Sequence, residues 1–153
     1  MKSLKQHIYE KLILKKNIKT KEYNYHPKTR EELKKLLNDL IRERDYEADL
    51  NDIDVSEITD MSKLFFYSNF SGDISQWDVS NVTNMHQMFD GCITFNGDIS
   101  DWDVSNVKYM YAMFKNSKFN RDISKWNVSK TADTRCMFER CPIKEEYKPK
   151  FKN

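Results

Sequence analysis

A tandem repeat constrains this chain more than any other feature. The segment DISQWDVSNVTNMHQMF at residues 73–89 returns as DISDWDVSNVKYMYAMF at 98–114 and, more loosely, as DISKWNVSKTADTRCMF at 122–138. A degenerate copy, DLNDIDVSEITDMSKLF, occupies residues 49–65. Trp77 and Trp102 are 25 residues apart, and Trp102 and Trp126 are 24 apart. Such a period predicts stacked units, because one short unit cannot bury its own apolar face without neighbours.

Each unit carries two local patterns. Val82, Met85, Met88 and Phe89 have the spacing of one helix face, and Ser80 stands before them as an N-cap. The other units carry Ser56, Ser105 and Ser129 at that position. The preceding Asp-Ile-Ser-x-Trp stretch alternates like a short strand. We therefore predict an α/β solenoid of four repeats, each a short parallel strand plus a short helix, at residues 49–72, 73–97, 98–121 and 122 to about 143.

The repeat pattern resembles a known family. Asp-Ile-Ser-x-Trp-Asp-Val-Ser-Asn-Val-x-x-Met-x-x-Met-Phe is similar to the BspA-type leucine-rich repeats, found in surface proteins of mycoplasmas and gut bacteria, over residues 49–143. The resemblance implies a leucine-rich-repeat solenoid. Many of those proteins are exported adhesins or are uncharacterised, so it implies little about function.

The flanking segments predict a cap and a tail. Leu4, Ile8 and Leu12 suggest an amphipathic helix over residues 3–14. Thr29 and Glu32 form a capping box ahead of a second apolar helical face, made by Leu33, Leu36, Leu37, Leu40 and Ile41. We predict three parts: an N-terminal helical cap at 1–48, the repeats at 49–143, and a basic C-terminal tail at 144–153.

Charge is unevenly distributed along the chain. Residues 1–48 carry a net charge of +5, residues 49–121 carry −6 and residues 122–153 carry +3. Such asymmetry can steer a charged partner. The N-terminus shows no signal-peptide core or membrane span, and the three cysteines fit a reducing compartment. We therefore expect a cytoplasmic protein without membrane contact; its oligomeric state stays open.

The sequence contains no convincing catalytic or metal-binding pattern. His7, His26 and His86 lie in three different contexts, and the cysteines form no CxxC pair. Cys92 and Cys141 occupy equivalent positions two repeats apart, at ~10 Å, too far for a disulfide, so free thiols are expected. The aspartates that open the repeats (Asp49, Asp73, Asp98 and Asp122) are best interpreted as turn caps. We predict no enzyme activity, no metal and no cofactor.

Two sets of repeat positions are candidates for a binding face. Trp77, Trp102 and Trp126 form either a core ladder or an aromatic binding stripe, and the period alone leaves both interpretations open. Beside them, at two sets of equivalent positions, or columns, the side-chain type changes between repeats while the surrounding repeat residues stay nearly the same. They contain Gln76, Asp101 and Lys125, and Asp78, Asp103 and Asn127. Solenoids present such columns to partners, so we predict these six as partner-binding residues.

The leading hypothesis is a non-enzymatic protein-binding module: a small intracellular inhibitor, adaptor or scaffold, including the speculative case of a phage or mobile-element product that blocks a host defence complex. One alternative is nucleic-acid binding through Lys15, Lys16, Lys19 and Lys21 with Tyr23 and Tyr25. Another is a structural component of a virion or cell surface.

Overall fold

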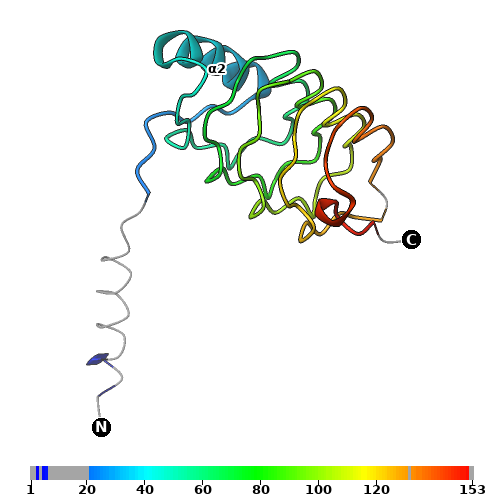
Figure 1. The fold of residues 1–153 in the computed structure, drawn as a ribbon. Coiled ribbons are helices and arrows are strands. Elements are labelled where there is room, and N and C mark those ends of the chain that lie inside the picture. The colour runs from blue at the N-terminus through cyan, green and yellow to red at the C-terminus, as the bar shows by residue number, and fades with distance from the viewer. Residues whose placement is uncertain (1–2, 4, 7–20, 131, 152–153) are drawn as a thin grey trace.

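The computed structural model describes residues 3, 5–6, 21–130 and 132–151 of the chain. Its helix α2 spans Arg30–Arg44 and its short 3₁₀ helix η1 spans Glu145–Tyr147. Between them the repeats form successive coils that lie side by side, with α2 against the first coil and the C-terminus beside the last (Figure 1). The helix predicted over residues 3–14 falls almost entirely outside the described residues.

The prediction of an α/β leucine-rich-repeat solenoid is wrong. Within the described part of the repeats there is neither a helix nor a named strand, only isolated parallel bridges between neighbouring coils. One line of bridges joins Asp60, Asn84, Tyr109 and Asp133. These residues lie in the segment for which we predicted a helix, whereas the predicted strand segment folds as turns. Ser56, Ser80, Ser105 and Ser129 are therefore not helix N-caps.

Left-handed backbone conformations replace the predicted helices. Each coil has two residues with positive φ, for example Gln87 at 50° and Gly91 at 70° in the second coil. A residue in this region interrupts an α-helix. The intervening three- and four-residue turns nevertheless return Met85, Met88 and Phe89 to the inside, where all three are buried. Turns of this length thus produce the same apolar spacing as a helix.

Hydrogen bonds between backbones hold the coils together. In the second coil, alternate N–H groups donate to carbonyls of the third: Met85 to Tyr109 at 2.8 Å, Gln87 to Tyr111 at 3.0 Å, Phe89 to Met113 at 2.9 Å and Gly91 to Lys115 at 2.8 Å. The N–H groups between them close turns within their own coil, as Met88 does with the Met85 carbonyl. The N–H groups of this segment of the second coil are therefore paired without regular secondary structure.

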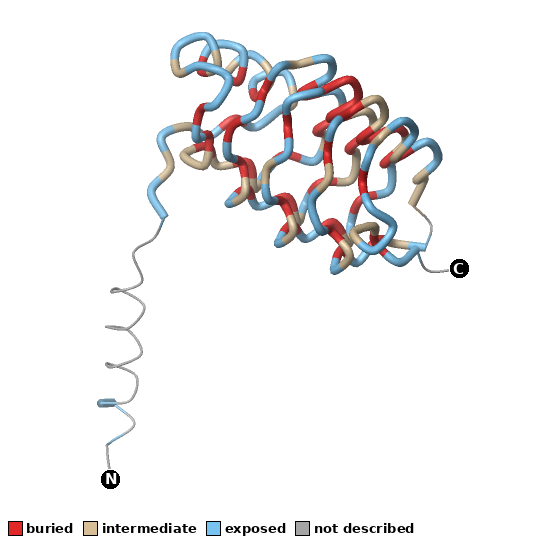
Figure 2. Tube along the Cα trace, viewed as in Figure 1, coloured by how far each residue is buried: buried red, intermediate tan, exposed pale blue. Residues whose placement is uncertain are grey.

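The interior consists of stacked apolar columns, as Figure 2 shows by the buried segments that recur at the same place in each coil. One column contains the rings of Phe65, Phe89, Phe114 and Phe138, with neighbouring centroids 5.3, 5.5 and 5.8 Å apart and nearly parallel. A second contains Phe70, Phe95 and Phe119. Stacked apolar rings combine area burial with favourable offset geometry, so the predicted continuous core is present.

The tryptophan column belongs to this core. Trp77, Trp102 and Trp126 are 3–4% exposed. Each indole N–H donates to a carbonyl of the preceding coil: to Leu50, Ile74 and Ile99 at 2.9, 3.3 and 3.0 Å. The core interpretation is confirmed, and the alternative of an exposed aromatic stripe is wrong.

Helix α2 begins and packs as its sequence predicts. Thr29 Oγ1 accepts the Glu32 N–H, and the Glu32 carboxylate accepts the N–H of Lys28, one residue before the position that a standard capping box would use. Leu33 and Leu37 are buried on its inner face, together with Leu40. At the other end, residues 142–151 lie against the fourth coil, where Ile143 is buried and the Ile123 N–H donates to the Tyr147 carbonyl.

Candidate partner-binding surface

The six predicted binding residues all lie on the surface. Gln76, Asp101 and Lys125 occupy equivalent exposed positions in three consecutive coils, each directly before a buried tryptophan. Asp78, Asp103 and Asn127 follow the same tryptophans and are also exposed. The stack thus brings together two parallel columns of polar side chains. We call these six residues the tryptophan-flanking columns.

Part of the second column also shapes the turns. Asp78 Oδ1 accepts hydrogen bonds from the Ser80 N–H at 3.1 Å and from its hydroxyl at 2.6 Å. Asp103 holds Ser105 in the same way, at 3.0 and 2.6 Å. A local carboxylate cap of this kind fixes a turn. The aspartates of this column therefore have a structural role beside any role in binding.

The aspartates that open the repeats are turn caps, as predicted. Asp49, Asp73, Asp98 and Asp122 each accept the backbone N–H two residues on, at 2.8–3.0 Å. Among the described residues no group of three His, Cys, Asp or Glu side chains could hold a metal ion.

These hydrogen bonds make part of the stability dependent on pH. The Ser100 hydroxyl lowers the pKa of Asp98, and the Ser105 hydroxyl lowers that of Asp103, each with help from the backbone N–H of the same serine. A carboxyl pKa that is lower in the folded state than the unfolded value of about 3.9 stabilises the fold above that pH. This contribution is lost as the pH falls through the folded pKa.

We therefore expect the urea midpoint to fall as the pH is lowered from about 5 to 3, the range where unfolded carboxyls titrate. The double variant Asp98→Asn/Asp103→Asn keeps an acceptor oxygen at each turn but removes the titrating groups, so its midpoint should fall less. Urea titrations at pH 7, 5, 4 and 3 measure this. An identical decline in wild type and variant would contradict the assignment.

Asp101 and Lys125 line a groove between the third and fourth coils. The groove has a volume of about 240 Å³ and is also lined by Asp98, Ser100, Arg121 and Asp122. A second groove of about 400 Å³ shares Asp98 and Arg121 and continues toward Glu47. Arg121 is anchored by its Nε, which donates to the Asn96 carbonyl at 2.8 Å. Mixed charges of this kind suit polar and charged side chains of a protein partner.

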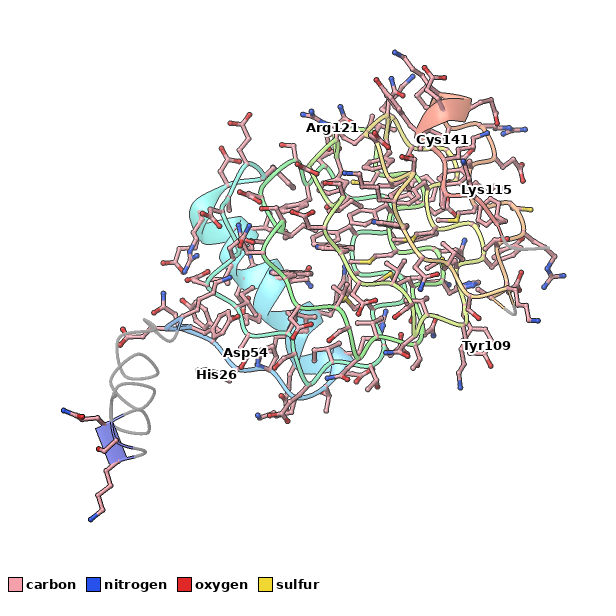
Figure 3. The ribbon with its side chains drawn as sticks, turned by 90° about the horizontal axis from the view of Figure 1, so that it is seen from below. His26, Asp54, Tyr109, Lys115, Arg121 and Cys141 are labelled. Atoms are coloured by element: carbon pink, nitrogen blue, oxygen red, sulfur yellow. The ribbon has the colours of Figure 1, made fainter. Side chains whose placement is uncertain are left out.

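The other edge of the coils has a different chemistry. Figure 3 shows Arg121 and Tyr109 at opposite edges of the stack. Tyr109 is 55% exposed. Beside its column, His86 stacks on Tyr111 at 5.3 Å between ring centroids, and Arg135 lies 5.8 Å from the centre of the Tyr111 ring. This edge thus presents stacked aromatic rings next to the guanidinium group of Arg135.

Sequence reasoning missed a groove beside α2. It has a volume of about 850 Å³, and its lining includes the exposed aromatic residues Tyr46, Phe66 and Tyr67. A signal was present, because the first repeat carries Phe66-Tyr67 where the second carries Asp90-Gly91. The third and fourth repeats are also polar at these positions, with Lys115-Asn116 and Glu139-Arg140.

The remaining predicted residues have local partners. His26 Nδ1 lies 3.3 Å from Asp54 Oδ2, a pair that Figure 3 labels, while His7 falls outside the described residues. Cys92 and Cys141 are free thiols, as predicted. Each has its sulfur near a carbonyl of the preceding coil, that of Phe70 or Phe119.

Only part of the basic N-terminal segment is described. Lys21 Nζ lies 5.0 Å from the centre of the Tyr23 ring and donates to the Gln76 carbonyl at 3.4 Å. Lys15, Lys16 and Lys19 fall outside the described residues. Nucleic-acid binding through this segment stays a prediction.

Comparison with known families gives a match over most of the chain. Residues 32–149 match the family described as "Mycoplasma protein of unknown function, DUF285". The chain belongs to the DUF285 family. The DUF285 match includes most of α2 as well as all four coils. No curated protein and no solved structure matches the chain. Among the residues that the structure describes, no helix is long and apolar enough to cross a membrane.

Proposed function

We propose that this chain is a non-enzymatic protein-binding module that acts as a small inhibitor, adaptor or scaffold. The supporting observation is the contrast between the two sides of each coil. The buried columns repeat with little change, whereas the tryptophan-flanking columns are exposed, with three different residues in the first column and a change from aspartate to asparagine in the second. A rigid frame that presents variable polar columns is how repeat proteins bind partners.

The groove between the third and fourth coils is the centre of the proposed surface. Asp101 and Lys125 line it from adjacent coils, and both are exposed. Neither side chain caps a turn, in contrast to Asp78 and Asp103. Changes at Asp101 and Lys125 therefore test binding without removing a turn cap. We also propose that the chain is related to the BspA-type repeat proteins, and this proposal rests on the repeated sequence pattern alone.

The test is a capture experiment with the full chain on a lysate of cells that encode it. We expect a stoichiometric protein partner whose recovery falls about tenfold, or ~1.4 kcal/mol, in the double variant Asp101→Lys/Lys125→Glu. The matched control Glu31→Lys/Lys35→Glu exchanges two exposed charges on α2. It also leaves the net charge unchanged, and it should recover the partner fully. Equal recovery by both double variants would contradict the proposed surface. Recovery of nucleic acid that moderate salt releases would favour the alternative function.

A further inference from the structure

The last coil carries a row of backbone N–H groups without acceptors. In the third coil, the N–H groups of Met110, Ala112, Phe114 and Asn116 donate to carbonyls of the fourth coil at 2.8–3.0 Å. The equivalent groups of the fourth coil belong to Thr134, Cys136, Phe138 and Arg140. None of these four N–H groups has an acceptor among the described residues. We call this row the donor edge.

The opposite end of the stack is closed by α2. Arg30 Nε donates to the Ser62 carbonyl at 2.7 Å, and Lys34 Nζ donates to the Leu64 carbonyl. These two carbonyls belong to the face of the first coil that no preceding repeat covers. Burial against the coil lowers the pKa of Lys34. The stack therefore has one capped acceptor end and one open donor end.

The donor edge sets the chemistry of what can pair with it. The carbonyls of Thr134, Cys136 and Phe138 already accept turn N–H groups within the fourth coil, from Met137, Glu139 and Cys141. The edge thus presents donors alone, and an occupant must supply carbonyl acceptors at alternate residues, as an extended segment does. A second copy of the chain is a poor occupant, because Arg30 and Lys34 occupy its matching carbonyls.

The side chains around the donor edge add positive charge. Arg140, which belongs to the edge, and Lys130, in the same coil, are exposed, whereas Arg135 is engaged by Asp133 through two hydrogen bonds. Phe138 ends the stacked ring column, is half-buried, and has Lys148 Nζ 5.7 Å from its ring centre. The C-terminal segment pairs with this coil at Ile123 and reaches Phe138 through Lys148, but none of its described backbone carbonyls accepts from the N–H row. An acidic segment matches these features.

We propose that the donor edge docks an extended, acidic segment of a partner protein, whose carbonyls accept the N–H groups of Thr134, Cys136, Phe138 and Arg140. This inference rests on the proposed protein-binding function and adds a second contact at the end of the stack. The pairing would continue the backbone ladder that already joins the four coils. It involves no covalent step.

The test uses the full ¹⁵N-labelled chain and two synthetic peptides. The first copies residues 82–95, whose carbonyls at Asn84, His86, Met88 and Asp90 serve as acceptors within the stack. It carries one acidic residue, Asp90, and neither lysine nor arginine. The second copies residues 107–119, the equivalent segment of the third repeat, and carries three lysines and no acidic residue. We expect the first peptide to shift the four donor-edge amide resonances and to slow their hydrogen exchange at least threefold.

Charge variants make the prediction sharper. In Lys130→Glu/Arg140→Glu, the affinity for the acidic peptide should fall and that for the lysine-rich peptide should rise. The matched control Lys35→Glu/Lys118→Glu makes the same change in net charge away from the edge, and should keep the wild-type order. Exchange at the four amides that is unaltered by either peptide would overturn the proposal, as would shifts confined to other coils. If neither peptide binds the donor edge but recovery of the captured partner still depends on Asp101 and Lys125, the donor-edge proposal fails and the proposed function is retained.

Discussion

Replacing Phe89 with alanine should lower the free energy of unfolding by about 3–5 kcal/mol, the range for a large buried aromatic side chain. Phe89 is fully buried at the middle of the stack. Its ring stacks on Phe65 and Phe114 in the neighbouring coils at 5.3 and 5.5 Å, and on Phe95 in its own coil at 4.3 Å. Truncation leaves a cavity in two interfaces between coils at once, because each repeat is stabilised mainly by its neighbours.

Urea unfolding followed by circular dichroism and by tryptophan fluorescence measures this effect. The control is Tyr67→Ala, which removes a ring of similar size that is 67% exposed, and its change should stay within about 0.5 kcal/mol, as for most surface substitutions. Similar losses in the two variants would mean that the ring column is not the core of the fold.

Replacing Gly72 with alanine should be comparably severe, for a different reason. A Cβ atom at this position would lie 2.0 Å from the Ala48 carbonyl oxygen. The same oxygen accepts the Asp73 N–H at 3.1 Å, so it is part of the ladder between the entry to the first coil and the second. Relief of the clash requires backbone movement. We expect a loss of about 3 kcal/mol, the upper end of the usual range for overpacking.

Gly97 is the matched control, because it occupies the equivalent position one repeat later. A Cβ atom there would meet ring atoms of Phe95 at 2.8 and 3.0 Å, and the nearest backbone atom, the Gly72 oxygen, is 3.6 Å away. A ring can shift slightly whereas a paired carbonyl cannot, so Gly97→Ala should cost about 1 kcal/mol, the lower end of that range. Chemical denaturation of both variants gives the comparison, and a larger loss at Gly97 would contradict the geometry.

The repeat predicted the interior well but not the backbone. Period and apolar spacing correctly identified buried columns, including Met110, Met113 and Phe114, but left the tryptophan column open. They could not distinguish a helix from turns of three and four residues, since both return side chains to one face at the same intervals. The one local sign was Gly91 and Asn116 at a positive-φ position, since these two residue types tolerate that conformation best.

The candidate surfaces were predictable to different degrees. Variation between copies identified the tryptophan-flanking columns, and the structure places all six residues on the surface. The donor edge has no signature in any single repeat, because Thr134 or Cys136 lacks an acceptor only through its place in the last described coil. The aromatic groove at Tyr46 and Phe66 depends on the packing of α2 against the first coil, which no local pattern encodes.

Scalar couplings across hydrogen bonds test the central claim, which is that neighbouring coils are joined by a backbone ladder rather than built from helices. We predict couplings from the amide nitrogens of Met85, Gln87, Phe89 and Gly91 to the carbonyl carbons of Tyr109, Tyr111, Met113 and Lys115. Couplings from these nitrogens to carbonyls four residues earlier in the chain would show a helix at this segment, and would contradict the account.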